Sequence, residues 1–340
     1  MNAYTFSDVL IKPKYSEITS RSTVDISSNL KRVKLGLPII SANMKTITEA
    51  KMAVALSEHG AIGALHRFNT VEDAVNEFDE FYDILSITAK NNTSYNMPIV
   101  SVGVQEADKE RFDKLYEAGA RIFCIDVAHG HHILVKNMLE WIISKQLYDI
   151  IVIAGNVATA DGAYDLADWG TDVIKVGIGP GSVCQTRQKT GVGVPQLYAL
   201  DSIFNEFKNQ GIKHVGIIAD GGITSVGDIC KALKFADTVM IGSMLSGTSE
   251  TPGNVYRDPS GQFYKVYGGS ASAENKGQNK FVEGMMKTVP FRGKAKYILR
   301  EIEDGVKSTF SYVGANNMEE YKEKCEFQFI TDGASRESKF

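Results

Sequence analysis

The stretch KVGIGPGSVCQTR, residues 175–187, combines a glycine-rich loop with a cysteine near its end. Glycines let the backbone curl, so successive carbonyl or amide groups can face an ion or a ligand. A thiol in such a loop, with Thr186 close behind it, is typical of a catalytic nucleophile whose thiolate is stabilised by its surroundings. Cys124 lies in an apolar run and Cys230 in a helical pattern, which is typical of buried structural cysteines. We therefore predict that Cys184 is a nucleophile.

Two further glycine motifs, DGG at residues 220–222 and IGS at residues 241–243, each follow an apolar run. In barrels of alternating strands and helices, the last two such loops often bind phosphate through backbone N–H groups. Asp220 would repel a phosphate, and we expect it to bind ribose hydroxyls instead. The glycines could also be simple turn residues. The pattern favours a nucleotide or another phosphorylated small molecule as the ligand.

Polar residues elsewhere are open to more than one interpretation. The histidines of residues 129–132 have no carboxylate or cysteine at metal-ligand spacing, so we expect a solvated loop or a substrate-lining role rather than a metal site. Asp126, at the end of an apolar run, is a better candidate for lining the site. Glu283 lies next to a glycine and is either an acid–base residue or a solvated charge.

The elements that must position these residues follow a regular alternation. Short apolar runs alternate with amphipathic segments, and most runs end in Gly, Asp, Asn or His. The eight predicted strands are residues 38–44, 61–66, 98–104, 121–130, 150–156, 172–179, 215–222 and 237–244. Helical patterns between them include residues 48–60, 107–119, 159–170 and 225–236.

Runs that are apolar on both faces and separated by helices indicate a parallel sheet. Eight such units predict an α/β fold of the TIM (β/α)8-barrel type, although an open doubly wound sheet could use the same alternation. In a barrel the site lies at the carboxyl ends of the strands, where the polar residues above are found. We expect one catalytic domain over residues 1–340, with residues 1–37 as an N-terminal extension and residues 245–293 as an active-site flap.

Composition excludes several classes of function. The chain has 340 residues, 43% of them hydrophobic, a net charge of −4 and no long apolar run, so we expect no membrane insertion. Lysine and arginine are scattered, which argues against nucleic-acid binding. The four cysteines are irregularly spaced and the N-terminus lacks a secretory pattern, so we expect a reduced, cytoplasmic location.

With these residues assembled, the chain resembles the IMP dehydrogenase and GMP reductase family over nearly its full length. The motifs that carry the resemblance are TFSDVLIKPKYSE, SANM, GNVAT, KVGIGPGSVC, TGVGVPQL, IADGGI, GDICKAL, VMIGSML and SYVGA, in this order. The resemblance implies a barrel with a catalytic cysteine, in which a purine nucleotide stacks against a nicotinamide cofactor.

The resemblance favours the reductase branch of that family. Residues 67–97 leave no room for the regulatory (CBS-type) domain of paired repeats that dehydrogenases usually carry, and residues 268–293 lack their water-activating Arg-Tyr pair. The SANM loop and Glu283 are similar to the reductase pattern. The ending ITDGASRES resembles a dehydrogenase tail, Gln185 replaces a common Thr, and Lys280 replaces a common Arg. A dehydrogenase that lacks its regulatory domain and converts IMP and NAD to XMP is therefore the alternative.

The reaction implied is reductive deamination of GMP to IMP and ammonia, with NADPH as the hydride donor. By this resemblance the thiolate of Cys184 adds to C2 of the purine, ammonia leaves, and a covalent thioimidate remains. Thr186 and Glu283 are implied as the proton relay to the leaving amine. An FMN-dependent barrel oxidoreductase and a non-catalytic nucleotide sensor are the other functions compatible with the DGG and IGS motifs.

The resemblance also implies binding residues and an assembly. Substrate contacts fall on Asp220, Gly221, Gly222, Gly242, Ser243, Gly269, Ser270, Lys280 and Gly284. Cofactor contacts fall on Ser20, Arg21, Arg67, Asp126, Val127, Ala128, Ile178, Gly179, Ser308, Thr309, Phe310 and Ser311, the last four from a neighbouring subunit. Backbone carbonyls of Gly179, Gly181 and Cys184 are implied as a monovalent-cation site, with K+ as the candidate ion. The expected assembly is a homotetramer.

Overall fold

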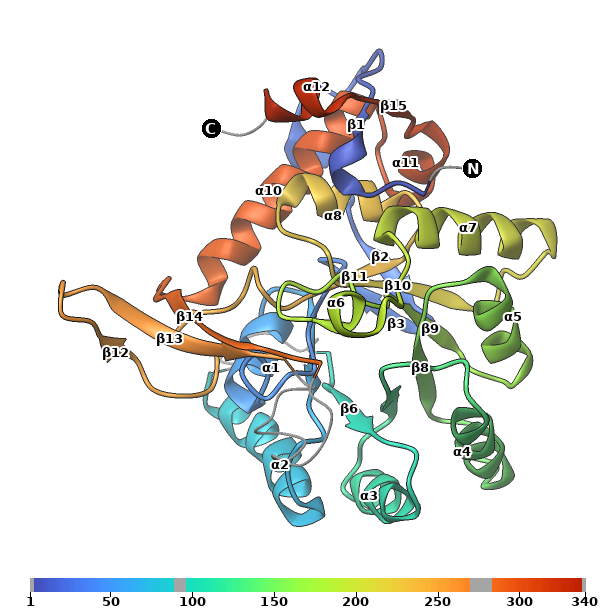
Figure 1. Cartoon of the computed structure of the whole chain (residues 1–340), viewed down its shortest axis with the longest axis vertical. Coiled ribbons are helices and arrows are strands. Elements are labelled where there is room, and N and C mark those ends of the chain that lie inside the picture. Colours follow the sequence, from blue (N-terminus) through green and yellow to red (C-terminus); the bar gives the residue numbers. More distant parts are fainter. Residues whose placement is uncertain (1–2, 89–95, 270–282, 338–340) are drawn as a thin grey trace.

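A closed barrel of eight parallel strands forms the centre of the molecule in the computed structural model, which describes residues 3–88, 96–269 and 283–337 (Figure 1). The strands are hydrogen-bonded in the order β10-β11-β4-β5-β6-β7-β8-β9, and β9 closes the barrel onto β10. Their bounds are β4 Ile39–Ser41, β5 Ile62–Leu65, β6 Ile99–Val102, β7 Ile122–Asp126, β8 Ile151–Val157, β9 Val173–Val176, β10 Gly216–Asp220 and β11 Thr238–Ile241. The barrel prediction is confirmed, and closure rules out the open sheet.

Helices surround the barrel on its outer face, as Figure 1 shows. Those that follow the barrel strands are α1 Ala50–Ser57, α2 Val71–Thr88, α3 Glu106–Glu117, α4 Ile133–Ser144, α5 Ala160–Asp168, α7 Gln196–Asn209, α8 Val226–Leu233 and α10 Ala295–Val313. A short helix, α6 (Thr186–Thr190), lies between β9 and α7. The start of α8 is fixed by Ser225, whose hydroxyl accepts from the backbone N–H of Asp228, while the Asp228 carboxylate accepts from the backbone N–H of Ser225.

Side chains alternate between two apolar cores along each strand. In β8, Ile151 and Ile153 point into the barrel, whereas Val152 and Ala154 pack against the surrounding helices. This period of two explains why the runs are apolar on both faces. The predicted strand over residues 121–130 is longer than β7, because the chain turns after Asp126 and Gly130 donates instead to the Asn156 carbonyl.

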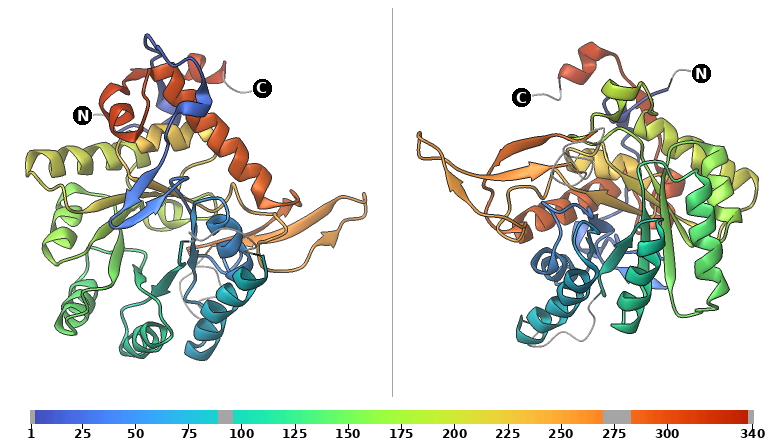
Figure 2. Two further views of the ribbon diagram at one scale, coloured as in Figure 1. Left: turned by 180° about the vertical axis from the view of Figure 1, so that it is seen from behind. Right: turned by 60° about the horizontal axis from the view of Figure 1, so that its bottom comes forward.

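The N-terminal extension closes one end of the barrel. Its hairpin consists of β2 (Ser28–Leu30) and β3 (Val33–Leu35), and Leu30 and Leu35 belong to the core inside the barrel. The two ends of the chain are also joined, because β1 pairs antiparallel with β15 (Figure 2). The remaining bounds are η1 Phe6–Asp8, β1 Val9–Ile11, η2 Arg21–Thr23, α11 Met318–Lys324, β15 Phe327–Phe329 and α12 Asp332–Arg336.

The excursion after β11 has regular structure of its own, which the sequence pattern did not predict. β12 (Tyr256–Arg257), β13 (Phe263–Gly268) and β14 (Met286–Pro290) form an antiparallel sheet. This arm projects from the barrel in all three views of Figures 1 and 2. Its strands were missed because polar and apolar residues alternate only briefly and because the two longer strands lie 17 residues apart in the chain.

Among the helices in the described ranges, none is both long and apolar enough to cross a membrane.

Candidate active site

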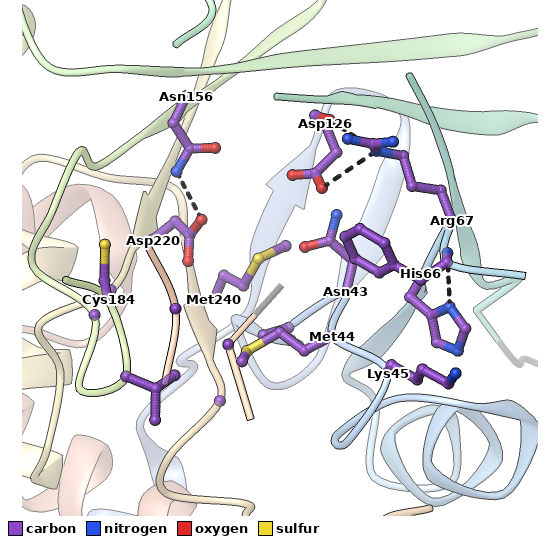
Figure 3. A pocket seen from close by; sticks show the side chains of 18 of the residues that line it. Asn43, Met44, Lys45, His66, Arg67, Asp126, Asn156, Cys184, Asp220 and Met240 are labelled. Carbon is purple, nitrogen blue, oxygen red and sulfur yellow. Dashed lines mark hydrogen bonds and ion pairs between the residues drawn. The ribbon is translucent and has the colours of Figure 1, made fainter. Parts of the chain in front are cut away.

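The carboxyl ends of the barrel strands surround a cavity of about 1190 Å³ (Figure 3). Most of the residues predicted from the sequence lie in its wall. These are the predicted catalytic residues Cys184, Thr186 and Glu283, and the predicted binding residues Arg67, Asp126, Val127, Ala128, Ile178, Gly179, Gly181, Asp220, Gly221, Gly222, Gly242, Ser243, Gly269 and Gly284. A cavity of this size exceeds the range of about 300–1000 Å³ typical of a single small-molecule pocket, so it has room for two ligands.

The three predicted catalytic side chains form a hydrogen-bonded chain. The Sγ atom of Cys184 lies 3.2 Å from the Oγ1 atom of Thr186, and that hydroxyl donates to the Oε2 atom of Glu283 at 2.8 Å. A hydroxyl has one proton, so Thr186 accepts from the thiol when it donates to the carboxylate. The arrangement therefore offers a path for the thiol proton to Glu283. Cys184 is exposed to the cavity, as a nucleophile must be.

Backbone hydrogen bonds join the segment before β14 to the loop that carries Cys184, and they place Glu283 beside this loop. The N–H of Gln185 donates to the Glu283 carbonyl at 2.7 Å, and the N–H of Met285 donates to the Val183 carbonyl at 3.1 Å. Gly269, from the end of β13, lies so close that a Cβ atom there would be 3.1 Å from the Cα of Gly284. Glycine at this position lets the arm and the cysteine loop pack backbone against backbone.

Backbone N–H groups line the cavity beside this chain. The loops after the adjacent strands β10 and β11 contain Gly221, Gly222, Gly242 and Ser243. Within the described ranges, these four N–H groups donate to no other backbone or side-chain acceptor. Gly221 and Gly222 both have positive φ, a conformation that favours glycine. Free N–H groups in neighbouring loops are suited to a phosphate.

The floor of the cavity carries a buried lysine between two carboxylates. The ammonium of Lys175 lies 2.9 Å from Oδ2 of Asp220 and 3.1 Å from Oδ1 of Asp126, and it also donates to Asn156. Burial alone would lower the pKa of Lys175, but Asp220 and Asp126 outweigh it and raise that pKa well above its usual value. Burial alone would raise the pKa of Asp126, but Lys175 and Arg67 hold it below its usual value. Lys175 is therefore charged and Asp126 ionised at neutral pH.

Arg67 lines the side of the cavity opposite Cys184 in Figure 3. Its Nε atom donates to the Asp126 carbonyl at 3.0 Å and lies 3.9 Å from the Asp126 carboxylate. The guanidinium also lies over the ring of Phe68, with 5.2 Å from Cζ to the ring centre. The positive charge is thus fixed on this side, together with the backbone of residues 127–128.

The remaining predicted cofactor residues lie outside this cavity and beside one another. Ser20 caps η2, and Arg21 lies 5.6 Å from the ring centre of Tyr312, which follows residues 308–311 on α10. The side chain of Phe310 is fully buried and stacks on Tyr321, so only its backbone remains for a ligand. The predicted substrate residues Ser270 and Lys280 fall outside the described residues.

The histidines of residues 129–132 have structural partners. The Nε2 atom of His131 lies 2.7 Å from the Asp165 carboxylate, and its ring lies beside Trp169. His132 caps α4 by accepting from the N–H of Leu134. These contacts favour a structural role for this loop.

A different group, Glu49, His66 and Glu77, has ligand atoms within 4.8 Å of one another, which is compatible with a metal ion by spacing. The tautomer of His66 argues against it. Its Nδ1 atom accepts from the N–H of Phe68 at 3.1 Å, so a neutral ring carries its proton on Nε2, the atom that faces Glu49. A protonated nitrogen cannot bind a metal. We therefore interpret this group as a carboxyl group, that of Glu77, packed near the buried ring of His66.

Sequence reasoning assigned no role to Lys175 or Asn156, although both are part of the floor. A signal was present for Lys175, because a lysine in the middle of an apolar run must find a partner when it is buried. Tyr267 was also missed. It lies on β13 and lines the cavity, and burial is the main reason why the pKa of its hydroxyl is raised.

Comparison with known proteins agrees with this geometry. The model of the IMP dehydrogenase / GMP reductase domain matches residues 3–340. The chain is 38% identical over 338 residues to the GMP reductase of Vibrio campbellii, covering 95% of this chain and 93% of the relative. It is 37% identical over 323 residues to the GMP reductase of Albidiferax ferrireducens, covering 94% and 93%.

It is also 33% identical over 457 aligned positions to the inosine-5'-monophosphate dehydrogenase of Nitrosopumilus maritimus, covering 95% of this chain and 94% of that one. Among solved structures, a cysteine-to-alanine variant of GMP reductase from Trypanosoma brucei in complex with guanosine 5'-monophosphate is similar, with a TM-score of 0.89 and 28% identity. That likeness covers 100% of this chain and 98% of the other.

Proposed function

The chain belongs to the IMP dehydrogenase and GMP reductase family, and we propose that it is a GMP reductase that converts GMP to IMP and ammonia. The observation that carries this proposal is the chain of Cys184, Thr186 and Glu283, because it joins a nucleophile to a carboxylate that can protonate a leaving amine. Alignment length supports the reductase branch. The alignment with the N. maritimus dehydrogenase spans 457 positions, more than the 340 residues of this chain, whereas those with the two reductases span 338 and 323.

The substrate would lie with its phosphate on the free N–H groups of residues 221–222 and 242–243 and its ribose on Asp220. This placement brings the purine to the cysteine loop, between Cys184 and the floor of the cavity. Asp220 is suited to the ribose because Lys175 and Asn156 hold one carboxylate oxygen, while about a fifth of its side chain remains exposed. Gly269 and Gly284 would border the base.

The first half of the reaction follows from the hydrogen-bonded chain. The proton of the Cys184 thiol passes through Thr186 to Glu283, and the thiolate adds to C2 of GMP. Glu283 returns this proton through Thr186 to the amino group, which leaves as ammonia while the C2–S bond is kept as a thioimidate. One proton is taken from the thiol and one is delivered to the amine, so the step is balanced. Thr186 and Glu283 are not needed once ammonia has left.

The second half needs a hydride, which a nicotinamide cofactor bound in the same cavity would supply to C2. The cavity volume and the fixed charges of Arg67 and Asp126 fit such a group on the side opposite Cys184 (Figure 3). In this step the C2–S bond breaks, the Cys184 thiolate is released, and IMP forms. We propose NADPH as the physiological donor, with residues 127–128 and 178–179 completing its site.

Assembly would complete the cofactor site. Ser20, Arg21 and residues 308–311 lie together but do not line the cavity of their own chain. We propose that they contact a cofactor bound to another copy of the chain, within a homotetramer. The carbonyls of Gly179, Gly181 and Cys184 belong to one tight loop, in which Cys184 N–H donates to the Gly181 carbonyl. Carbonyl oxygens are the ligands that K+ takes, and they would hold it there.

The test is a spectrophotometric assay of the purified protein with GMP and NADPH, with GMP and NADH, and with IMP and NAD. Loss of the reduced nicotinamide with GMP, abolished in Cys184→Ala, is the expected result. Formation of reduced nicotinamide from IMP and NAD, with no oxidation in the presence of GMP, would instead establish the dehydrogenase, which relatives such as that of N. maritimus represent.

A further inference from the structure

Lys175 occupies a central position that the proposed reaction does not explain. It lies on β9 with 2% of its surface exposed, and its ammonium contacts side chains from both flanking sides of the barrel. Asp126 ends β7, Asn156 lies on β8 and Asp220 ends β10, so four consecutive strands each contribute one residue. The strand register sets this arrangement, because Gly155 pairs with both Asp126 and Lys175.

The two carboxylates that Lys175 holds lie on different sides of the cavity. Asp220 lies towards Cys184 and the nucleotide side of the cavity, and its bond to Asn156 is drawn in Figure 3. Asp126 lies on the cofactor side, where Arg67 approaches it. The two side chains keep 21% and 14% of their surface exposed to the cavity.

The negative charges around Lys175 keep its side chain protonated. Asp126 and Cys124 face it from β7, Asp220 faces it from β10, and Arg67 lies beyond Asp126. Burial raises the pKa of Cys124 to about 12, so that thiol is neutral and adds no charge. The ammonium is therefore the one cation that contacts both carboxylates in the described part of the chain. Without it, two buried carboxylates would repel each other and turn away from the positions that ligands need.

We propose that Lys175 is a positioning residue that couples the nucleotide and cofactor sides of the cavity by fixing Asp220 and Asp126 together. This inference rests on the proposed function for the identity of the two ligands. Its consequence is that one side chain, acting through these two carboxylates, sets the affinity for both ligands. A lysine that contributes only to stability would lower the melting temperature when replaced and leave both affinities unchanged.

The test measures binding rather than turnover, by titration calorimetry of the full-length protein with GMP and, separately, with NADPH. Lys175→Met keeps the length of the side chain and removes the charge, and we expect about a tenfold loss of affinity for each ligand. Lys265→Met is the matched control, because Lys265 is equally buried but, among the described residues, donates only to the backbone carbonyls of Thr248 and Thr251. We expect the control to lower the melting temperature and leave both affinities within twofold of wild type.

The alkylation rate of Cys184 by iodoacetamide provides a second measure, since the other three cysteines are buried. An unchanged rate in Lys175→Met, together with the two affinity losses, would support positioning. Unchanged affinities, loss of affinity for one ligand alone, or an equal loss in Lys265→Met would overturn it.

If Lys175→Met does not fold, the same comparison is made in a protein that carries Asp126→Asn, so that, within the described part of the chain, Asp220 is the one carboxylate left beside residue 175. Asp126→Asn retains the contact between Lys175 and Asp220, whereas Asp126→Asn with Lys175→Met lacks it and leaves only one buried charge. About tenfold weaker GMP binding in the double variant supports the inference, and equal binding overturns it. Wild type that binds GMP but does not oxidise NADPH would contradict the proposed function and leave this comparison valid.

Discussion

The carboxyl group of Glu77 provides a test of the electrostatics of the cavity wall. Burial first, and then the nearby carboxylates of Glu49 and Glu80, raise its pKa from 4.5 to about 8. The hydrogen bond from Asn69 and the charge of Arg111 oppose this rise without cancelling it. Its Oε1 atom is buried and has no hydrogen-bond partner among the described residues. The folded protein therefore holds Glu77 protonated at neutral pH.

The sign of the pH dependence follows from proton linkage. Between about pH 4.5 and 8 the folded state binds a proton at Glu77 that the unfolded state has lost, so stability falls as pH rises through this window. A rise in pKa from 4.5 to about 8 corresponds to at most about 5 kcal/mol at 1.36 kcal/mol per pH unit. Because Glu77 borders the cavity, water screens part of this cost, and we expect about 2 kcal/mol.

Glu77→Gln removes this ionisation with almost no change of shape. Relative to wild type, the variant should gain about 2 kcal/mol between pH 5 and pH 9, which is about 3 °C in melting temperature for a chain of this size. Thermal unfolding followed by circular dichroism across this range measures it. Glu72→Gln, an exposed position on the same helix whose charge does not contribute to the Glu77 shift, is the control and should follow wild type closely. If Glu77→Gln and wild type show parallel pH profiles, the buried-acid interpretation is wrong.

Three further predictions concern the site itself. Thr186→Val breaks the link between the thiol and Glu283, so kcat with GMP should fall about 100- to 10,000-fold while the calorimetric Kd for GMP stays within threefold; an unchanged kcat would exclude the relay. Gly177→Ala would place a Cβ 1.9 Å from the Asp220 carbonyl, so melting temperature and GMP affinity should both drop, and a variant that binds GMP like wild type would refute the close approach. Brief iodoacetamide treatment of the folded protein, read by mass spectrometry, should modify Cys184 alone, because burial raises the pKa of the Cys124 thiol to about 12 and that of Cys230 likewise; early label on either of these would contradict their placement.

The sequence by itself determined the parts of the protein that depend on local pattern. Eight apolar runs separated by helical segments predicted the eight barrel strands, because burial on both faces leaves a continuous apolar signature. The glycine-rich loop led to Cys184, and the DGG and IGS motifs led to two loops that line the cavity, because these residue types report backbone conformation where they occur.

Only the tertiary structure decided which of these residues meet. Thr186 and Glu283 are 97 residues apart, and their contact depends on the arm, whose strands left too weak a pattern to predict. Lys175 could be recognised as a buried charge, but its partners come from β7, β8 and β10, and strand register in the closed barrel selects them. Ser20 and Arg21 lie outside the cavity because η2 packs beside α10 at the surface. Such long-range pairings depend on chain topology and closure, which hydrophobic periodicity does not encode.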